Sequence, residues 1–162
     1  MRWQLRNGRM IDIDGVSHIG IVVPDLEAAC VFFADKFGCP VGEPIDVPGQ
    51  ALRLAYVVVG PVKIELLTPT APNSAIARFL DRNPKGGLHH VAFSVVDAQV
   101  AADASLGAGL QIIGGVPQPG HHGRPLFFLH PKDTLGALFE IEQREGAQDR
   151  SPTGQRRNDA KA

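Results

Sequence analysis

An internal repeat constrains the fold of this chain more than any other feature of its sequence. The segment HIGIVVPDLEAA (18–29) aligns with HVAFSVVDAQVAA (90–102), and the alignment places His18 on His90, 72 residues later. In each segment a β-branched apolar run leads into a helical pattern, so the two halves begin with the same strand and helix. A supersecondary unit that is used twice predicts two similar modules with a shared core.

Each half continues with three further strand-like segments separated by Pro and Gly. Asp25 suits the N-terminal cap of the first helix and Gly38 suits its end, whereas Asn73 or Ser74 caps a short helix between the halves. We therefore expect an α+β fold of two tandem βαβββ modules that form one curved mixed sheet. The expected parts are an N-terminal extension (1–15), module one (16–70), a linker helix (72–82), module two (87–144) and a disordered tail (145–162).

The composition excludes several classes of function. With a net charge of −1, the chain offers no electrostatic attraction for nucleic acid or an anionic membrane surface. Its apolar runs are too short to cross a bilayer, and its first residues lack the apolar segment of a secretory signal. Cys30 and Cys39 are too few for a disulfide framework, so a cytoplasmic location is expected.

The segment LHHVAFSVVD (88–97) carries two adjacent histidines at the start of a predicted strand. Neighbouring residues of a strand point to opposite faces, so only one of the two reaches a given site. His90 shares its face with the small Ala92, as His18 does with Gly20, which is typical of a face that lines a cavity. His89 has the parity of the packed face, so we predict His90 for the site and a structural role for His89.

The ends of the two halves also correspond, because KIELL (63–67) stands where LFEIE (138–142) does, which pairs Glu65 with Glu140. Glu140 interrupts an apolar run, where a buried carboxylate must be paired or bound to metal. Glu65 shares a face with Lys63, a pattern typical of a solvated face, and only the repeat argues for it. Two imidazoles and two carboxylates suit one divalent ion such as Co, Zn, Ni, Mn or Fe. The predicted metal ligands are His18, Glu65, His90 and Glu140.

Three stretches carry a family resemblance: HIGIVVPDLEAA, KIELLTPTAPNSAIARFLDRNPKGGLHHVAFSV and HHGRPLFFLHPKDTLGALFEIEQ. From about residue 16 to 143 the chain closely resembles methylmalonyl-CoA epimerases. These enzymes belong to the vicinal oxygen chelate superfamily, together with glyoxalase I, extradiol dioxygenases and bleomycin-resistance proteins. The resemblance implies the glyoxalase fold, a homodimer and an acyl-CoA thioester substrate. It also implies the same four metal ligands, Glu65 included.

The implied reaction is inversion at the α-carbon of a 2-methyl-branched dicarboxyl-CoA thioester through a metal-stabilised enolate. Inversion needs proton-transfer groups on both faces of the planar enolate, and Glu140 is the first candidate for one of them. Some family members carry a second glutamate in the strand equivalent to 51–59, where the alignment places Leu54, which cannot move a proton. The candidates for the second group are Glu43, His121 and His122. The loop HHGRP, with Gly123, and Lys132 of HPKD are the candidates for contacts with the acyl-CoA.

Other activities stay open from the sequence alone. A glyoxalase I-type lyase/isomerase, or another vicinal oxygen chelate enzyme on a related substrate, would use the same metal site. An extradiol dioxygenase is disfavoured because Glu65 adds a fourth ligand and no further His or Tyr stands out on the cavity-facing strands. A metal-free binding protein of this superfamily typically lacks the ligands, whereas all four positions are filled in this chain.

Overall fold

The computed structural model describes residues 10–146 and contains eight strands in one mixed sheet. Module one consists of β1 (Ile13–Val22), α1 (Leu26–Phe37), β2 (Ile45–Val47), β3 (Leu52–Val59) and β4 (Val62–Pro69). The helix α2 (Ala75–Arg82) connects the modules. Module two consists of β5 (Gly87–Val95), α3 (Ala98–Gly107), β6 (Ile112–Pro119), β7 (Pro125–Leu129) and β8 (Phe139–Gln143). The predicted pair of βαβββ modules is confirmed.

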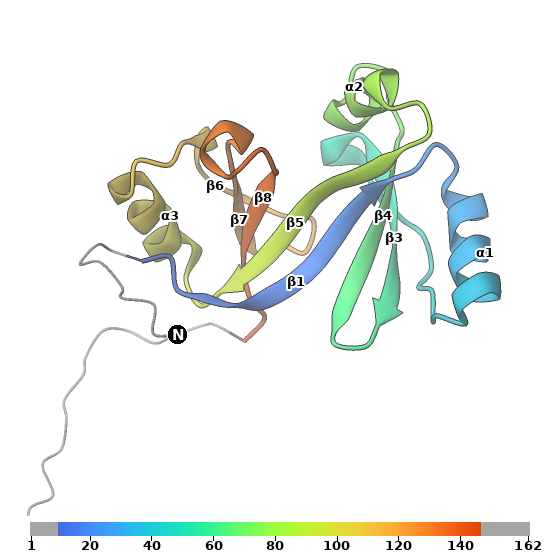
Figure 1. Cartoon of the computed structure of the whole chain (residues 1–162), viewed down its shortest axis with the longest axis horizontal. Coiled ribbons are helices and arrows are strands. Elements are labelled where there is room, and N and C mark those ends of the chain that lie inside the picture. The colour runs from blue at the N-terminus through green and yellow to red at the C-terminus, as the bar shows by residue number, and fades with distance from the viewer. Residues whose placement is uncertain (1–9, 147–162) are drawn as a thin grey trace, which may run out of the picture.

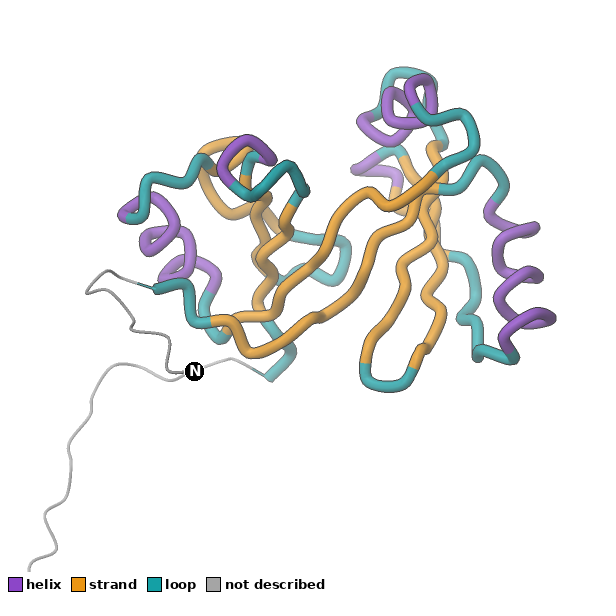
Figure 2. The backbone as a smooth tube through the Cα atoms, in the orientation of Figure 1, coloured by secondary structure: helices purple, strands orange, loops and turns teal. Residues whose placement is uncertain are grey.

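The sheet order is β2-β3-β4-β1-β5-β8-β7-β6, so the two modules join through their first strands. β1 and β5 are antiparallel to each other, whereas β1 pairs with β4, and β5 with β8, in parallel. Figure 1 shows these two long strands side by side through the middle of the molecule, with β3 and β4 at one end and β7 and β8 at the other. The sheet is curved and open, and α1 and α3 lie at its two far ends (Figure 2).

Local signals explain where the helices begin and end. The Asp25 side chain accepts a hydrogen bond from the Ala28 backbone N–H at 2.8 Å, and Gly38 ends α1 in the left-handed conformation at φ 62°. Asp97 is the equivalent cap in module two, since its carboxylate accepts from the N–H groups of Gln99 and Val100. The repeat therefore extends to the N-terminal caps of the two helices.

Some predicted bounds need correction. β1 begins at Ile13, because the strand continues in antiparallel pairing with β5 beyond the expected start at residue 16. The linker helix covers Ala75–Arg82 rather than 72–82, because Ser74, and not Asn73, accepts the capping hydrogen bond, from Ala77. Most of the predicted extension and tail (1–9 and 147–162) lies outside the described residues.

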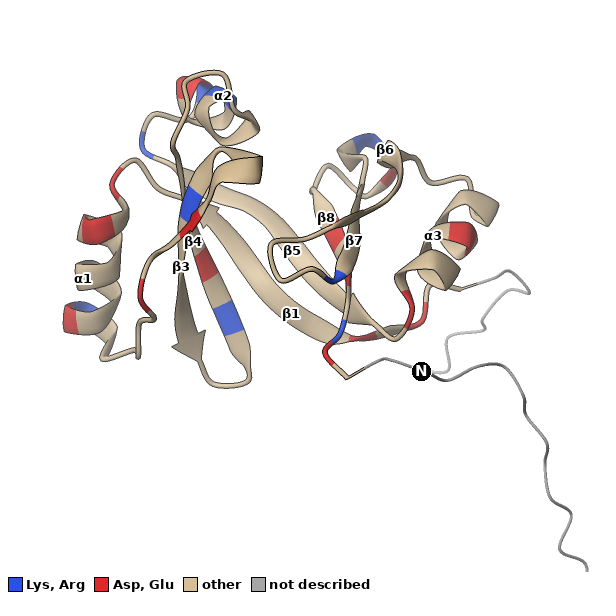
Figure 3. Cartoon of the chain, turned by 180° about the vertical axis from the view of Figure 1, so that it is seen from behind, with Lys and Arg blue, Asp and Glu red and all other residues tan. Residues whose placement is uncertain are grey.

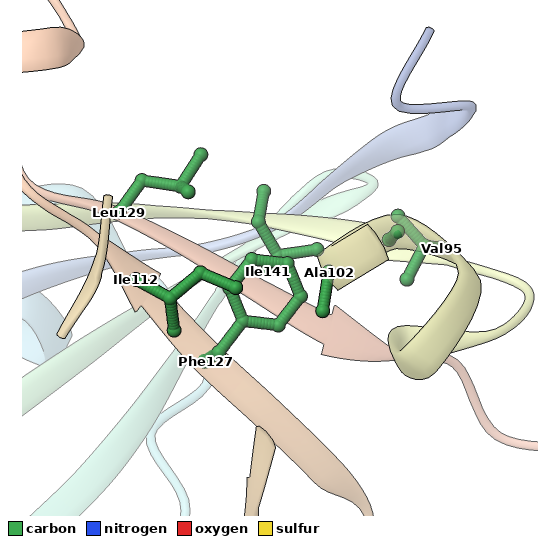
Figure 4. Packing of buried hydrophobic residues seen from close by; sticks show 7 residues of the cluster. Val95, Ala102, Ile112, Phe127, Leu129 and Ile141 are labelled. Atoms are coloured by element: carbon green, nitrogen blue, oxygen red, sulfur yellow. The ribbon is translucent and has the colours of Figure 1, made fainter. Parts of the chain in front are cut away.

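Alternation along the strands separates a packed face from a concave face. In module one Leu26 of α1 packs on Ala55, Val57 and Leu66, with Ile21 beside them. In module two α3 covers an equivalent cluster, shown in Figure 4: Val95, Ala101, Ala102, Ile112, Phe127, Leu129 and Ile141. The predicted strand parity is confirmed, and it leaves the opposite face of both modules to line a cavity.

The linker helix α2 covers part of that concave face. Ile76 of α2 packs against Val22, Leu54 and Leu67, together with Phe79 from the same helix.

Acidic and basic residues are spread over both modules in Figure 3 rather than gathered by sign. Within residues 10–146 no helix is both long and apolar enough to cross a membrane.

Candidate metal centre

The two histidines of the repeat meet where the modules join. In the register between β1 and β5, His18 lies opposite Ala92 and His90 lies opposite Gly20. Each imidazole therefore faces the small residue of the partner strand. At Gly20 this is a strict requirement, because a Cβ atom there would lie 2.2 Å from Cε1 of His90. The small residues two positions after each histidine leave room for the rings.

The two glutamates flank this pair on opposite sides. β4 pairs with β1 so that Glu65 lies beside Gly20, and β8 pairs with β5 so that Glu140 lies beside Ala92. All four side chains belong to the concave face and are buried, each residue with 5% of its surface exposed: His18, Glu65, His90 and Glu140.

Each glutamate has a carboxylate oxygen close to the Nε2 atoms of both histidines. The Nε2 atoms of His18 and His90 lie 3.1 Å apart. Oε2 of Glu65 lies 3.5 and 3.6 Å from these two nitrogens, and Oε2 of Glu140 lies 3.9 and 3.3 Å from them. Metal–ligand bonds of about 2.1 Å at angles of 90–110° place neighbouring donors about 3.0–3.4 Å apart. The ligand atoms of His18, Glu65 and His90 all lie within 4.8 Å of one another, so these three side chains fit one divalent ion with little rearrangement. Glu140 lies beside them, close to both imidazoles.

The electrostatics of the cluster also favour a cation. Burial, with the adjacent histidines, lowers the pKa of His90 to about 3, so its imidazole is neutral, as a metal ligand must be. Burial raises the pKa of Glu65 to about 7 and raises the pKa of Glu140 above its usual value. Two carboxylates held this close in a buried site lack compensating charge, which a divalent ion supplies.

The Nδ1 atoms of both ligands have partners that hold the rings in place. Nδ1 of His18 lies 3.2 Å from the Ser17 hydroxyl, and that hydroxyl donates to Glu142. Nδ1 of His90 lies 2.9 Å from Nδ1 of His89. Because the Ser17 hydroxyl donates to Glu142, it accepts from Nδ1 of His18, and this tautomer leaves Nε2 of His18 free for metal. The contact with His89 holds the ring of His90 in place. The packed-face parity predicted for His89 is wrong, because His89 lies at an irregularity in the β1–β5 register and lines the cavity beside His90. Its structural role stays a prediction.

Tyr56 belongs to the site, although the sequence pattern around it does not mark it as a site residue. Tyr56 of β3 lies opposite Glu65 in the β3–β4 register, and its hydroxyl donates to Oε1 of Glu65 at 2.8 Å. The same hydroxyl lies 3.2 Å from Nε2 of His121 and 3.5 Å from Nε2 of His122. The statement that no further Tyr or His stands out on the cavity-facing strands is therefore wrong for Tyr56. The short hairpin between β3 and β4 places Tyr56 opposite Glu65, and this pairing is the sequence feature that could have predicted the contact.

A cavity of about 510 Å³ lies above the four donors and is lined by both modules. Its module-one wall is apolar, with Leu52, Leu54 and Leu67. The loop between β6 and β7 contributes polar groups to the cavity: Gly120, His121, His122 and Arg124. Leu54, which the sequence resemblance aligns with a glutamate of some family members, is 1% exposed and faces this cavity.

The remaining predicted residues fall in different places. His122 lines the cavity, and Gly123 follows it in the same loop, at φ 74°. Glu43 is exposed in the segment before β2, and the structure does not bring it to the cavity. Lys132 is exposed in the short helical turn before β8 and also lies outside the cavity lining.

Known proteins resemble this chain over most of its length. A family model of the Glyoxalase/Bleomycin resistance protein/Dioxygenase superfamily matches residues 17–128. The ethylmalonyl-CoA/methylmalonyl-CoA epimerase of Cereibacter sphaeroides is 43% identical over 132 residues, which are 81% of this chain and 98% of that protein. The mitochondrial methylmalonyl-CoA epimerase of Bos taurus is 38% identical over 136 residues, 84% of this chain and 78% of that protein. A variant of the Streptomyces coelicolor methylmalonyl-CoA epimerase, in complex with 2-nitronate-propionyl-CoA, matches with a TM-score of 0.77 at 30% identity, covering 85% of this chain and 99% of that one.

Proposed function

This chain belongs to the methylmalonyl-CoA epimerases of the Glyoxalase/Bleomycin resistance protein/Dioxygenase superfamily, and from that premise we propose a metal-dependent inversion at the α-carbon of a 2-methyl-branched dicarboxyl-CoA thioester. The observation that carries the proposal is the buried cluster of two imidazoles and two carboxylates at the base of a cavity shared by both modules. Methylmalonyl-CoA is the first substrate to test, and ethylmalonyl-CoA is the second, because the Cereibacter relative is an ethylmalonyl-CoA/methylmalonyl-CoA epimerase.

The α-proton of such a substrate lies between a thioester and a carboxylate and becomes acidic only when the enolate charge is stabilised. When bound by His18, Glu65, His90 and Glu140, a divalent ion supplies positive charge beside the thioester carbonyl. The protein adds the apolar wall of Leu52, Leu54 and Leu67, which excludes water from the reacting carbon.

Glu140 is the carboxylate that we assign to proton transfer on one face of the carbon. Its close contacts are the Nε2 atoms of His18 and His90, at 3.9 and 3.3 Å. Among the described residues no hydroxyl donates to Glu140, whereas Glu65 accepts a hydrogen bond from Tyr56. One oxygen of Glu140 is therefore available to hold a proton, and Glu65 is more strongly fixed as a ligand.

Arg124 is the residue that we assign to the anionic groups of the substrate. Its side chain lines the cavity, and its Nε is buried without a hydrogen-bond partner among the described residues. The nearest acid is Glu142, with 4.0 Å between Nη2 of Arg124 and Oε2 of Glu142. A buried, unpaired guanidinium donor in a cavity favours an anionic ligand such as a carboxylate or a phosphate.

A homodimer is part of the proposal. Three apolar side chains of α1 are exposed, with exposed fractions of 58% for Val31, 49% for Phe32 and 65% for Phe37. The rings of Phe32 and Phe37 pack against each other with centroids 5.5 Å apart, which makes a continuous apolar area on the helix. Phe37→Lys is expected to shift the mass measured by light scattering from dimer to monomer, and a monomeric unmodified protein would contradict this part.

Deuterium wash-in at the α-carbon of methylmalonyl-CoA tests the proposed activity directly. The protein is expected to exchange the α-proton and to interconvert the two epimers, and a chelator is expected to stop both. Ethylmalonyl-CoA is assayed in parallel, beside methylglyoxal with glutathione as the glyoxalase control. Activity only on the glutathione adduct, or full activity without any divalent ion, would refute the proposal.

A further inference from the structure

We propose that His121 is the second proton-transfer residue of this site and acts on the face of the substrate opposite Glu140. The inference rests on the proposed function, because a second group is needed only if the reaction inverts a carbon centre. It assigns a task to a residue that neither the metal centre nor the pairing of the repeats uses.

His121 reaches the site from the loop between β6 and β7 of module two and contacts module one. Its Nε2 lies 3.2 Å from the Tyr56 hydroxyl, and the two rings are stacked with centroids 6.0 Å apart. Both His121 and the neighbouring Arg124 line the cavity. In Figure 1 this loop extends from β6 and β7 towards the middle of the molecule.

The sheet order places His121 and Glu140 on opposite sides of the central histidines. β4 and β3 follow β1 on one side, and β8 follows β5 on the other. Tyr56 therefore lies beyond Glu65, on the side away from Glu140, and His121 contacts Tyr56 there. A substrate held over the central pair meets Glu140 from the β8 side and His121 from the β3 side.

The hydrogen bonds around Tyr56 determine the tautomer of His121. The phenol has one proton, and it donates that proton to Oε1 of Glu65 at 2.8 Å. It can therefore only accept from His121, so the neutral imidazole carries its proton on Nε2 and leaves the Nδ1 lone pair free. Burial, with the adjacent His122, lowers the pKa of His121 to about 4, so the ring is a neutral base near pH 7. The chain from Glu65 through Tyr56 to His121 orients a base as a third group does in other active sites.

Other residues near the site fit this task less well. Leu54 has no proton to exchange, and the Arg124 side chain offers hydrogen-bond donors but no acceptor. Glu142 lies on β8, the same side as Glu140, and accepts a hydrogen bond from Ser17. His122 is more exposed than His121, and its Nε2 lies farther from the Tyr56 hydroxyl, at 3.5 Å.

The proposed proton transfer uses the two groups in opposite protonation states. Nδ1 of His121 takes the α-proton as the C–H bond breaks, and the electron pair moves into the thioester carbonyl to give the enolate. Glu140, present as the carboxylic acid, then gives its proton to the opposite face of the carbon. The product leaves His121 as an imidazolium and Glu140 as a carboxylate, which is the form that acts on the other epimer with the roles reversed.

The test is deuterium wash-in from D₂O into each separate epimer, measured for the unmodified protein and for His121→Gln. The variant is expected to lose at least about 100-fold in epimer interconversion, the usual loss when one acid–base group is removed. It should still exchange the α-proton of the one epimer that presents it to Glu140, without inversion. Its content of bound divalent ion should equal that of the unmodified protein. His130→Gln is the matched control, because His130 is exposed outside the cavity, and it should keep full interconversion.

Three results would overturn the assignment. His121→Gln could interconvert the epimers at the normal rate, or it could lose exchange in both epimers while its bound metal is retained. His122→Gln could show the one-sided exchange expected of His121→Gln. If the unmodified protein exchanges neither methylmalonyl-CoA nor ethylmalonyl-CoA, the proposed function fails first, and this assignment fails with it.

Discussion

A single added methyl group at Gly20 should remove metal binding while leaving the fold intact. The Cβ of Gly20→Ala would lie 2.2 Å from Cε1, 2.5 Å from Nδ1 and 2.7 Å from Nε2 of His90. Carbon atoms pack at about 3.5 Å or more, so the ring must retreat by about 1.3 Å. Metal–ligand distances tolerate only about 0.2 Å of change, so His90 ceases to be a ligand.

The expected loss of metal affinity can be estimated from the loss of His90 as a ligand. Removing an outer partner of a metal ligand typically weakens binding by about 10–100-fold, and losing the ligand itself costs more. We expect Gly20→Ala to weaken affinity for a divalent ion by at least about 100-fold, which corresponds to about 2.8 kcal/mol. The displaced ring should lower the free energy of unfolding by about 1–3 kcal/mol, as overpacking usually does.

The assay is competition for Co²⁺ or Zn²⁺ against a chromophoric chelator, with thermal unfolding of the metal-free protein measured alongside. Gly15→Ala is the matched control, because it adds the same methyl group to the same strand with no atom within 4 Å. The control should bind metal as the unmodified protein does. Unchanged affinity in Gly20→Ala, or equal loss in both variants, would refute the proposed geometry of His90 over Gly20.

Three further predictions concern the surroundings of the ligands. His89→Ala should weaken metal binding by about 10–100-fold, because His90 loses the partner of its Nδ1; unchanged affinity in the same competition assay would return His89 to a purely structural role. Arg124→Gln should raise KM for the acyl-CoA by about tenfold at unchanged metal content, since it removes a charge-assisted hydrogen bond; an unchanged KM would contradict the anion-binding role. Burial raises the pKa of Glu65 to about 7, so the metal-free carboxyl is mostly protonated at pH 6, and binding of a divalent ion there should release protons. Affinity should therefore rise between pH 6 and 8, and calorimetry in buffers of different ionisation enthalpy should detect the protons; pH-independent binding would contradict the raised pKa.

The sequence predicts a large part of the fold because the repeat and the strand alternation are local signals. His18 and His90, with their small neighbours, identify the concave face before any contact is known, and Asp25 and Gly38 mark α1. The pattern around Glu65 misleads because Lys63 shares its face. Along β4 the burial changes with position: Lys63 is exposed near the start of the strand, whereas Glu65 is 5% exposed and accepts a hydrogen bond from Tyr56.

The contacts of the loop between β6 and β7 could not be predicted in the same way. His121 meets Tyr56 across 65 residues and across the boundary between the modules. No periodicity along either segment encodes that approach, because it depends on how β1 and β5 join and on the curvature of the whole sheet. The same holds for His89, which lies at an irregularity in the β1–β5 register and lines the cavity beside His90.

The donor set is symmetric, but its surroundings are not, and this difference explains how a duplicated fold can invert a carbon centre. Each module supplies one histidine and one glutamate, yet only Glu65 accepts a hydrogen bond from a tyrosine among the described residues. That bond holds Glu65 as a ligand and, through Tyr56, orients His121. Glu140 has no such partner and keeps an oxygen for the proton. Inversion requires one group to be protonated while the other is not, and two groups of different chemistry on opposite sides satisfy this more readily than a strictly symmetric pair.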